Sequence, residues 1–476
     1  MFFDFDFNFR KDNFLELVQK IQSIRLIPLV AVCDFGPTNR SLLKDLKISA
    51  ENSVFIHDSL NQPLFFFADF PHMLKLLRNH LLDQGLFLPN GYYLSKTLFK
   101  KFLDLDTGEL KLCHKISESQ LLVKGSERQN VRKAAQLFSN SVASFIFEFL
   151  PSEKEGGNFI LLINNLFDLF NSTSEKNYLT PFNNAFCGSQ DQINLLLSAS
   201  EHIKNIRVGK IRGEDPIKSR TSLLPFQQGL IQSINSLIGL YKYVSENFEI
   251  RYILTYKITQ DSLENFFAQM RSIGHSYDHP TPLEFIYRFR ILIFMKNFST
   301  IQFSKNCEKE RIEEKYITYE IGKEIPPFLQ EKKDFQNPQN IRNNALFYLA
   351  GYVAKKCKKY SNCSYAFGGY ASHDSHSESS PFSKWVCLIS KGRLCLPSDL
   401  FWNQIQSLES EFSEFFPKKN LSGSSELVPS ISFKHPQISI QLVKCFIRSR
   451  LYFKLRVLNR KHPVRKNLRK LAKFVS

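Results

Sequence analysis

The chain has 476 residues, of which 43% are apolar and 14% aromatic, enough for large hydrophobic cores and too apolar for a disordered polypeptide. Its net charge of +18 and its pI near 9.4 attract polyanions, so nucleic acid is the leading partner. No apolar stretch reaches the roughly 18 to 20 residues of a membrane span and no signal segment begins the chain. Nine scattered cysteines indicate reduced thiols, and we expect an intracellular protein without a membrane anchor.

The first part of the chain alternates predicted strands and helices. Residues 2–9 alternate Phe with polar residues, as a half-buried strand does, and the apolar residues of 14–24 fall at helical spacing. The run 29–33 is short and continuously apolar, which is typical of a buried parallel strand. A further strand over 63–69 precedes a helix over 71–82 with proline in its first turn. This order predicts an α/β layer with a parallel component.

The middle of the chain, residues 84–257, has a mainly helical pattern. The segments 130–150 and 223–244 each place their apolar residues on one stripe at helical spacing. Residues 152–157, with two consecutive glycines, have the composition of a loop.

The last part of the chain begins with a predicted helix at Asp261, and a second helix covers 283–295. Residues 307–340 are charged and contain prolines, which indicates a linker. A helix over 344–356 opens a C-terminal region, in which 372–383 form a polar, Ser/His-rich loop.

Acidic residues at element ends are the candidates for chemistry. Asp34 ends the 29–33 strand, and Asp261 and Glu264 are three apart, so on a helix they share a face and could bind one metal. Each has an alternative role, since Asp before Phe-Gly-Pro suits a turn and Asp with Glu three residues later suits a helix start. Asp69 is a further candidate, for which capping the following helix is the simpler interpretation.

The C-terminal region is basic. No acidic residue follows Glu426, and the segment from Lys444 to Lys473 carries 12 Lys and Arg. Its bases alternate with apolar residues, so it either tracks a phosphate backbone or forms a solvated helix face. The candidate DNA contacts are Arg448, Arg450, Lys454 and Arg456.

The C-terminal region also contains six Cys and His residues whose spacing does not fit the usual zinc folds, so buried thiols are the first interpretation and structural zinc the second. These residues are Cys357, Cys363, His373, His376, Cys387 and Cys395. No Gly-x-x-x-x-Gly-Lys-Ser/Thr phosphate loop occurs anywhere in the chain.

Several blocks together resemble the conserved segments of P-element transposases, including the THAP-domain transposases of animals. Three of them carry the acidic residues: Val-Cys-Asp-Phe-Gly-Pro-Thr-Asn at 32–39, Phe-Ala-Asp-Phe-Pro-His-Met-Leu-Lys at 67–75, and Thr-Gln-Asp-Ser-Leu-Glu-Asn-Phe-Phe at 259–267. Further similar blocks occur at 114–139, 167–172 and 348–357. The resemblance extends over nearly the whole chain.

The resemblance implies an α/β plus α architecture: an RNase H-like catalytic fold split by a mainly helical, GTP-binding insertion domain and followed by a basic, mainly helical C-terminal DNA-binding domain. We accordingly expect the catalytic fold at 1–88 and 259–305, the insertion at 89–258, a linker at 306–342, and the C-terminal domain at 343–476. The insertion then accounts for the long separation of Asp34 from Glu264.

The resemblance also assigns roles. Asp34 is expected to be the second catalytic acid and Glu264 the last, with Asp261 an accessory carboxylate, in a two-metal Mg²⁺ site for cut-and-paste DNA transposition in the nucleus.

In the insertion, the resemblance assigns a guanine site. Phe167 is expected to stack on the guanine of GTP and Asp168 to accept from its edge, while Asn171 and Lys124 are weaker assignments.

The start of the chain departs from the family pattern. The family's first catalytic Asp lies on a strand upstream of the one expected at residues 2–9, and Asp4 and Asp6 lie on the wrong strand to replace it. We therefore expect a transposase polypeptide that binds DNA and GTP but is catalytically incomplete as the chain stands, which leaves its status as an enzyme open. The alternative is a non-enzymatic nuclear DNA-binding protein derived from a transposase, and a homo-oligomer is compatible with either.

Overall fold

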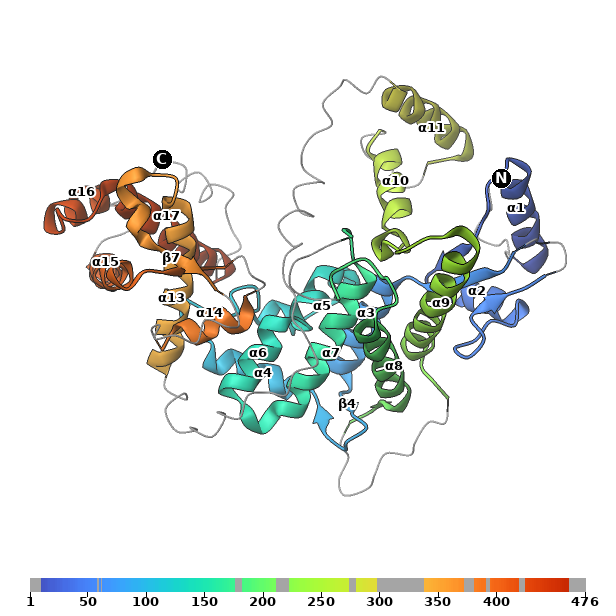
Figure 1. Cartoon of the computed structure of the whole chain (residues 1–476), viewed down its shortest axis with the longest axis horizontal. Helices are drawn as coiled ribbons and strands as arrows, with labels where there is room; N and C mark the ends of the chain where they lie inside the picture. Colours follow the sequence, from blue (N-terminus) through green and yellow to red (C-terminus); the bar gives the residue numbers. More distant parts are fainter. Residues whose placement is uncertain are drawn as a thin grey trace. The chain divides into compact units, whose positions relative to one another are not determined.

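The protein is described by a computed structural model of the whole chain (Figure 1). The structure describes residues 10–57, 60, 62–175, 182–210, 222–273, 280–297, 338–371, 381–390, 394–418 and 424–461. The expected strand at 2–9 and most of the expected linker and Ser/His-rich loop lie outside these residues.

The chain divides into two compact units, each made of three segments. The first unit contains Met1–Lys96, Leu122–Phe138 and Phe159–Gly322. The second unit contains Thr97–Leu121, Ser139–Asn158 and Lys323–Ser476. The expected insertion at 89–258 is thus divided between the two units.

A three-stranded sheet forms the centre of the first unit. Strand β1 (Val30–Cys33) pairs in parallel with β3 (Leu64–Ala68), and β2 (Val54–Phe55) pairs with the other edge of β3 in antiparallel fashion. The predicted parallel pair is confirmed. All five residues of β3 are buried, because helices cover both of its faces.

Helices α1 (Lys11–Ser23) and α9 (Pro225–Phe248) cover this sheet. The Phe14 ring of α1 lies 5.5 Å from that of Phe66, and the Tyr243 ring of α9 lies 6.0 Å from that of Phe65. Alternate residues of a strand point to opposite faces, so β3 is packed from both sides. Helix α2 (Pro37–Asp45) follows β1, and α3 (Phe70–Asp83) follows β3.

The remainder of the first unit adds short strands and further helices. Strands β4 (Leu86–Phe87), β5 (Tyr93–Leu94) and β6 (Arg207–Val208) form a second sheet in the order β5-β4-β6, which the sequence pattern did not predict. The helical elements are η2 (Gly125–Gln129), α5 (Val131–Leu137), α8 (Gln190–Asn205), η4 (Thr255–Lys257), α10 (Asp261–Ser272) and α11 (Pro282–Asn297).

Two predictions for the middle of the chain are wrong. The expected continuous helix over 130–150 is two helices, α5 and α6 (Asn140–Phe149), because Ser139 is extended, with ψ 151°, and starts a new helix. The expected loop over 152–157 is the short helix η3 (Pro151–Glu153) and the first turn of α7 (Lys154–Phe170). A Cβ at Gly157 would lie 2.7 Å from the Phe147 ring, so this glycine permits close packing of α7 on α6 rather than a turn.

The second unit is mainly helical. Besides α6 and η3 it contains α4 (Lys96–Leu105), η1 (Glu118–Gln120), α13 (Pro338–Cys357), η5 (Ser361–Ala366), β7 (Phe367–Tyr370), α14 (Ser383–Ile389), β8 (Cys395–Pro397), α15 (Asp399–Lys418), α16 (Ser424–Lys434) and α17 (Ile440–Lys461). Trp385 of α14 packs against Phe145 and Phe149 of α6. Helix α13 lies against β8 so closely that a Cβ at Gly351 would be 1.9 Å from the Cys395 carbonyl oxygen.

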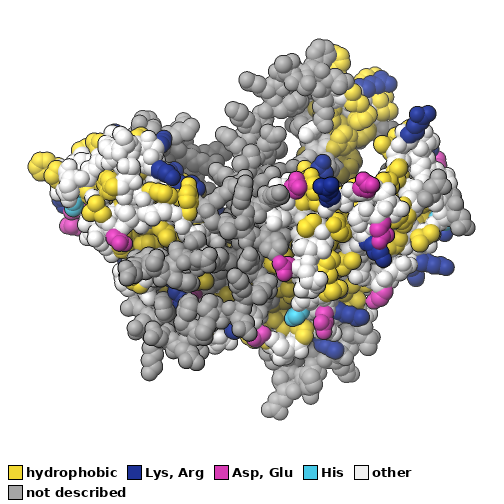
Figure 2. Space-filling model, in the orientation of Figure 1, with side chains coloured by type: hydrophobic (Ala, Val, Ile, Leu, Met, Phe, Trp, Pro, Cys, Tyr) yellow, Lys and Arg dark blue, Asp and Glu magenta, His cyan; other side chains and the backbone are white. Residues whose placement is uncertain are grey.

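Hydrophobic side chains gather over α10 and α11 in Figure 2. Within these helices Phe267, Leu283, Tyr287 and Phe294 are exposed. Even so, none of the helices that the structure describes is both long and apolar enough to cross a membrane.

Candidate functional site

The ends of two parallel strands place two acidic residues at the same edge of the sheet. Cys33 of β1 is paired with Ala68 of β3, so Asp34 and Asp69 follow neighbouring strands. The Asp69 backbone N–H also donates to the Cys33 carbonyl oxygen at 2.9 Å, which extends the pairing by one residue. In open α/β sheets, the edge at which parallel strands end is the usual place of a site.

Asp34 starts the turn into α2. Its Oδ1 accepts hydrogen bonds from the Gly36 backbone N–H at 3.0 Å and from Asn39 Nδ2 at 2.6 Å. The turn role predicted as an alternative is therefore confirmed. The half-buried carboxylate is held rigidly by these contacts at the strand end.

Asp69 connects the sheet to a helix that is distant in sequence. Its Oδ2 accepts from the His72 backbone N–H at 3.1 Å, which confirms the predicted cap of α3. Its Oδ1 accepts from the Gln260 backbone N–H at 2.9 Å, across 191 residues of sequence. Because Gln260 immediately precedes α10, this single buried carboxylate fixes the start of that helix at the sheet edge.

The first turn of α10 carries the other two predicted acids. Asp261 is half-buried and Glu264 is exposed, and Glu264 donates its backbone N–H to the Gln260 carbonyl oxygen. The spacing of three residues places both side chains on one helix face, as predicted. Asp34, Asp261 and Glu264 therefore all lie near Asp69. Their carboxylates do not converge on one common position.

Electrostatic coupling shows that these groups act on one another. Burial raises the pKa of Asp69, and the charge of Asp261 raises it further. Burial also raises the pKa of Glu264, with Asp69 and Asp261 adding repulsion. Carboxylates that repel one another in this way are the usual environment of a cation.

Two residues of α3 are electrostatically coupled to these acids, and the sequence interpretation assigned a site role to neither. Burial lowers the pKa of Lys75, while Glu264, Asp69 and Asp34 act in the opposite direction. Burial also lowers the pKa of His72, against the effect of Asp34 and Asp69. The spacing Asp69, His72, Lys75 is the signal that could have found them, since a capping residue and the residues three and six positions later lie on one side of a helix.

The donor chemistry of the site suits magnesium, because carboxylate oxygens are the ligands this ion prefers. In the part of the chain that the structure describes, however, no three His, Cys, Asp or Glu side chains are grouped so that they could hold a metal ion. Asp69 already uses both oxygens as acceptors of backbone N–H groups. The residues present therefore fit the ion in type but do not surround it.

Three of the predicted nucleotide contacts lie together at the end of α7. The Phe167 ring lies 6.2 Å from the Phe70 ring, and Asp168 Oδ2 accepts from Asn164 Nδ2 at 3.0 Å. Asn171 is exposed immediately after the helix. Lys124 lies in another segment, at the start of η2, with its side chain exposed.

The four predicted DNA contacts on α17 do not form one surface. Arg448 is exposed, whereas Arg450 is 4% exposed and forms a two-point ion pair with Glu409. Residues two apart on a helix point about 200° apart, so Arg448 and Arg450 lie on opposite sides of α17. Lys454 forms an ion pair with Glu109 of the same unit. The side chain of Arg456 is not among those that the structure describes.

Three cysteine thiols of the second unit interact with one another. The Cys445 thiol interacts with Cys357, which also interacts with Cys363. The hydrogen bond with the Cys357 thiol, and after it the positive charges of Arg448, Lys356 and Lys359, lower the pKa of Cys445 despite the opposing effect of burial. His373 and His376, the histidines of the zinc alternative, lie outside the described residues.

The chain is similar to known transposases over most of its length. Residues 71–181 match the family model described as the TNP-like, GTP-binding insertion domain. The chain is 29% identical to the transposable element P transposase of Drosophila melanogaster, covering 99% of this chain and 63% of that protein. It is 28% identical to the human DNA transposase THAP9, covering 60% of this chain and 34% of that protein.

A solved structure agrees with these matches. The Drosophila P element transposase strand transfer complex matches with a TM-score of 0.56 and 35% identity, covering 63% of this chain and 68% of the solved chain. The chain thus spans less than two thirds of the length of the curated relatives it matches.

Proposed function

The chain belongs to the P-element-type DNA transposases, and from this membership we propose that it acts on DNA in the nucleus and binds GTP through its insertion. The observation that carries its catalytic part is the hydrogen bond from the Gln260 N–H to Asp69. It holds the helix bearing Glu264 at the edge where β1 ends in Asp34.

The proposed catalytic fold is RNase H-like and is interrupted by the insertion. The parallel pair β1 and β3 would be part of its sheet, and α10 its returning helix. Contact across 191 residues between the end of β3 and the start of α10 is what such an interruption requires. The match of residues 71–181 to an insertion domain supports an insertion that follows β3, and it begins earlier than the expected boundary at residue 89.

In this proposal Asp34 and Glu264 hold Mg²⁺, with Asp261 as an accessory ligand. A bound Mg²⁺ pair would supply activation of water or a 3′-hydroxyl and stabilisation of the leaving oxygen of the phosphodiester. Lys75 offsets the mutual repulsion of the carboxylates before an ion binds, since it is coupled to Glu264 and Asp34.

Cleavage requires a further acid in this proposal. Two-metal sites take acids from several elements, and here Asp69 is occupied by the backbone of α3 and α10. Among the residues that the structure describes, the end of β1 and the first turn of α10 are then the places that offer carboxylates for an ion. We therefore expect this polypeptide by itself to bind DNA without cutting it.

A cleavage assay tests this part of the proposal. DNA carrying transposon ends is incubated with the chain and Mg²⁺, beside Glu264→Gln and the control Glu246→Gln, an exposed acid of α9. We expect duplex binding in all three proteins and no strand cleavage. Mg²⁺-dependent cleavage that Glu264→Gln abolishes and Glu246→Gln retains would show that the carboxylates present are sufficient.

For the nucleotide, we propose that Phe167 stacks on guanine and Asp168 accepts from its edge, with Asn171 and Lys124 as lesser contacts. Phe167 and Asp168 are both half-buried in the last turn of α7, so part of each side chain remains accessible to a ligand. Calorimetry with GTP should show binding that Asp168→Asn weakens more than tenfold, because asparagine keeps one acceptor oxygen and turns an amide N–H toward the other guanine donor. Equal affinity of the two proteins would remove this assignment.

A second candidate function is non-enzymatic DNA binding, and a basic surface of the second unit favours it. Lys356 and Lys359 at the end of α13 and Arg448 of α17 all act on the Cys445 thiol, so their charges converge. They are exposed, and the Lys356 ammonium lies 4.6 Å from the centre of the Tyr352 ring.

Salt dependence tests this surface. Each of Lys356→Gln, Lys359→Gln and Arg448→Gln should reduce the slope of log affinity against log salt by about one, if each contacts a phosphate. Lys434→Gln on α16, outside the surface, serves as the control. A flat salt dependence, or unchanged slopes in the three variants, would contradict DNA binding here.

A further inference from the structure

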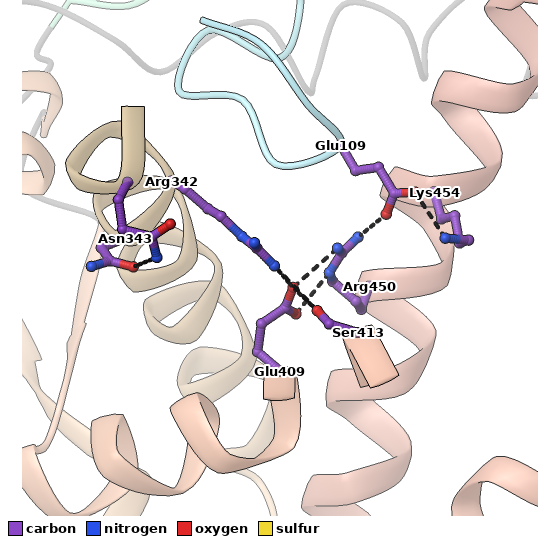
Figure 3. Close-up of polar contacts among 8 residues, drawn as sticks. Glu109, Arg342, Asn343, Glu409, Ser413, Arg450 and Lys454 are labelled. Atoms are coloured by element: carbon purple, nitrogen blue, oxygen red, sulfur yellow. Dashed lines mark hydrogen bonds and ion pairs between the residues drawn. The ribbon is translucent and has the colours of Figure 1, made fainter. Parts of the chain in front are cut away.

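The second unit contains a charged pocket that the proposed function does not use. It has a volume of about 500 Å³ and lies between α13, α15, α17 and the loop that follows α4. Figure 3 shows side chains of these four elements pointing toward one another: Glu109, Arg342, Glu409, Ser413, Arg450 and Lys454.

One acid of the pocket is a fixed part of the protein interior. Glu409 is 5% exposed, and its two oxygens accept from Arg450 Nε at 2.8 Å and Nη2 at 3.0 Å. Arg342 Nη2 reaches the same carboxylate at 3.2 Å and the Ser413 hydroxyl at 3.1 Å. Glu409 therefore anchors two guanidinium groups that extend from different helices.

The other acid is held in a different way. Glu109 lies on an irregular loop next to Gly108, which has a φ of +85° and open space around it. Its side chain is about a third exposed, with Oε1 2.8 Å from Lys454 Nζ and Oε2 3.0 Å from Arg450 Nη1. These two cations lower the pKa of Glu109 against the opposing effect of burial, so it is ionised at neutral pH.

The third nitrogen of Arg450 is not satisfied by this contact. Nη1 is buried and has no hydrogen-bond partner, although it lies 3.0 Å from Glu109 Oε2 in an ion pair. A buried donor without a hydrogen bond is costly, and a better acceptor in the pocket would gain that energy. Arg450 also stacks on the Phe412 ring at 4.6 Å, which keeps the guanidinium in place.

We propose that this pocket is a binding site for a phosphate group, which takes the place of the Glu109 carboxylate against Arg450, Lys454 and Arg342. When Glu109 swings out on its loop, three cations face the single acid Glu409. Phosphate offers more acceptor oxygens than a carboxylate and matches the guanidinium fork. Glu109 thus acts as an internal competitor that the ligand must displace.

The phosphate can belong to a free anion or to a phosphodiester of DNA. The free-anion arm is independent of the proposed function, whereas the DNA arm rests on it. The whole chain is used in both arms, because residues 97–121 and the C-terminal helices form one compact unit.

Calorimetry with inorganic phosphate, at constant ionic strength against chloride, tests the site. Glu109→Gln should bind phosphate about tenfold more tightly than the natural chain, since one partly exposed charge close to the site is removed. Lys454→Gln should bind at least about fivefold more weakly. Lys434→Gln, an exposed lysine of α16 paired with Glu411, should bind as the natural chain does.

A second measurement separates the phosphate site from a purely structural ion-pair network. In thermal unfolding, phosphate should raise the Tm of Glu109→Gln by more than it raises that of the natural chain. If Glu109→Gln binds phosphate no more tightly, or phosphate does not stabilise it further, the inference is overturned. In the DNA arm, tighter duplex binding by Glu109→Gln with competition by phosphate assigns a phosphodiester, and unchanged duplex binding with tighter phosphate binding assigns a free anion.

Discussion

Replacing Asp69 with asparagine should release the start of α10 from the sheet edge while leaving the rest of the first unit folded. Asp69 is 5% exposed and accepts from the backbone N–H groups of His72 and Gln260. Asparagine keeps one acceptor oxygen and turns an amide N–H toward the other donor. A hydrogen bond to a buried carboxylate contributes about 1.5 to 3 kcal/mol, and removal of the buried charge offsets part of this loss. We expect the free energy of unfolding to fall by about 1 to 2 kcal/mol.

The local effect should exceed the global one, because α10 has little else to hold it. Within α10 only Met270 is buried. Hydrogen exchange of the backbone amides of 261–272 should therefore accelerate in Asp69→Asn by more than the change in global stability accounts for.

The matched control is Ser189→Ala, which removes the side-chain cap of α8 in the same unit. It should cost about 1 kcal/mol without selective exchange in α10. If α10 exchanges equally in both variants, Asp69 is only a helix cap and the argument that it places Glu264 is refuted.

Two further predictions concern titrating groups in the second unit. Burial raises the pKa of Asp106 to about 6. The folded protein therefore binds the proton of the Asp106 carboxyl more tightly than the unfolded chain does. The free energy of unfolding should fall by about 3 kcal/mol as the pH rises from about 4 through 6. The free energy of unfolding is measured in urea at several pH values. Asp106→Asn should lose this pH dependence, and the exposed control Asp104→Asn should keep it. The same pH dependence in both variants would refute the raised pKa of Asp106. The lowered pKa of Cys445 predicts that its alkylation by iodoacetamide is half-maximal below the ordinary thiol value and that Arg448→Gln moves the midpoint upward. A midpoint near the ordinary thiol value in the natural chain would contradict this.

Local rules were sufficient for much of the first unit. The strands at 29–33 and 63–69, their parallel pairing and the helices around them follow from short apolar runs, helical spacing and proline positions. The turn at Asp34 and the cap at Asp69 also depend only on neighbouring residues. Such features are decided within a few residues of chain, so the sequence alone reveals them.

The same rules failed where a distant partner decides the outcome. Two glycines at 156–157 predict a loop, but the close approach of Phe147 makes Gly157 a packing residue inside α7. Arg450 looks like a DNA contact in a basic run, but Glu409 of α15 supplies the carboxylate that draws it into the interior. No local pattern specifies either partner.

The residue types at each strand end and helix start, including Asp34, Asp261 and Glu264, can be read from the amino-acid sequence, and the similarity of its blocks indicates the family. Which of these residues meet depends on the fold. Asp69 joins β3 to α10 by a bond between residues 191 apart, and that contact depends on packing of the intervening chain. Burial and charge then act on groups that the fold has placed together, which is why Lys75 emerged as part of the site only from the structure.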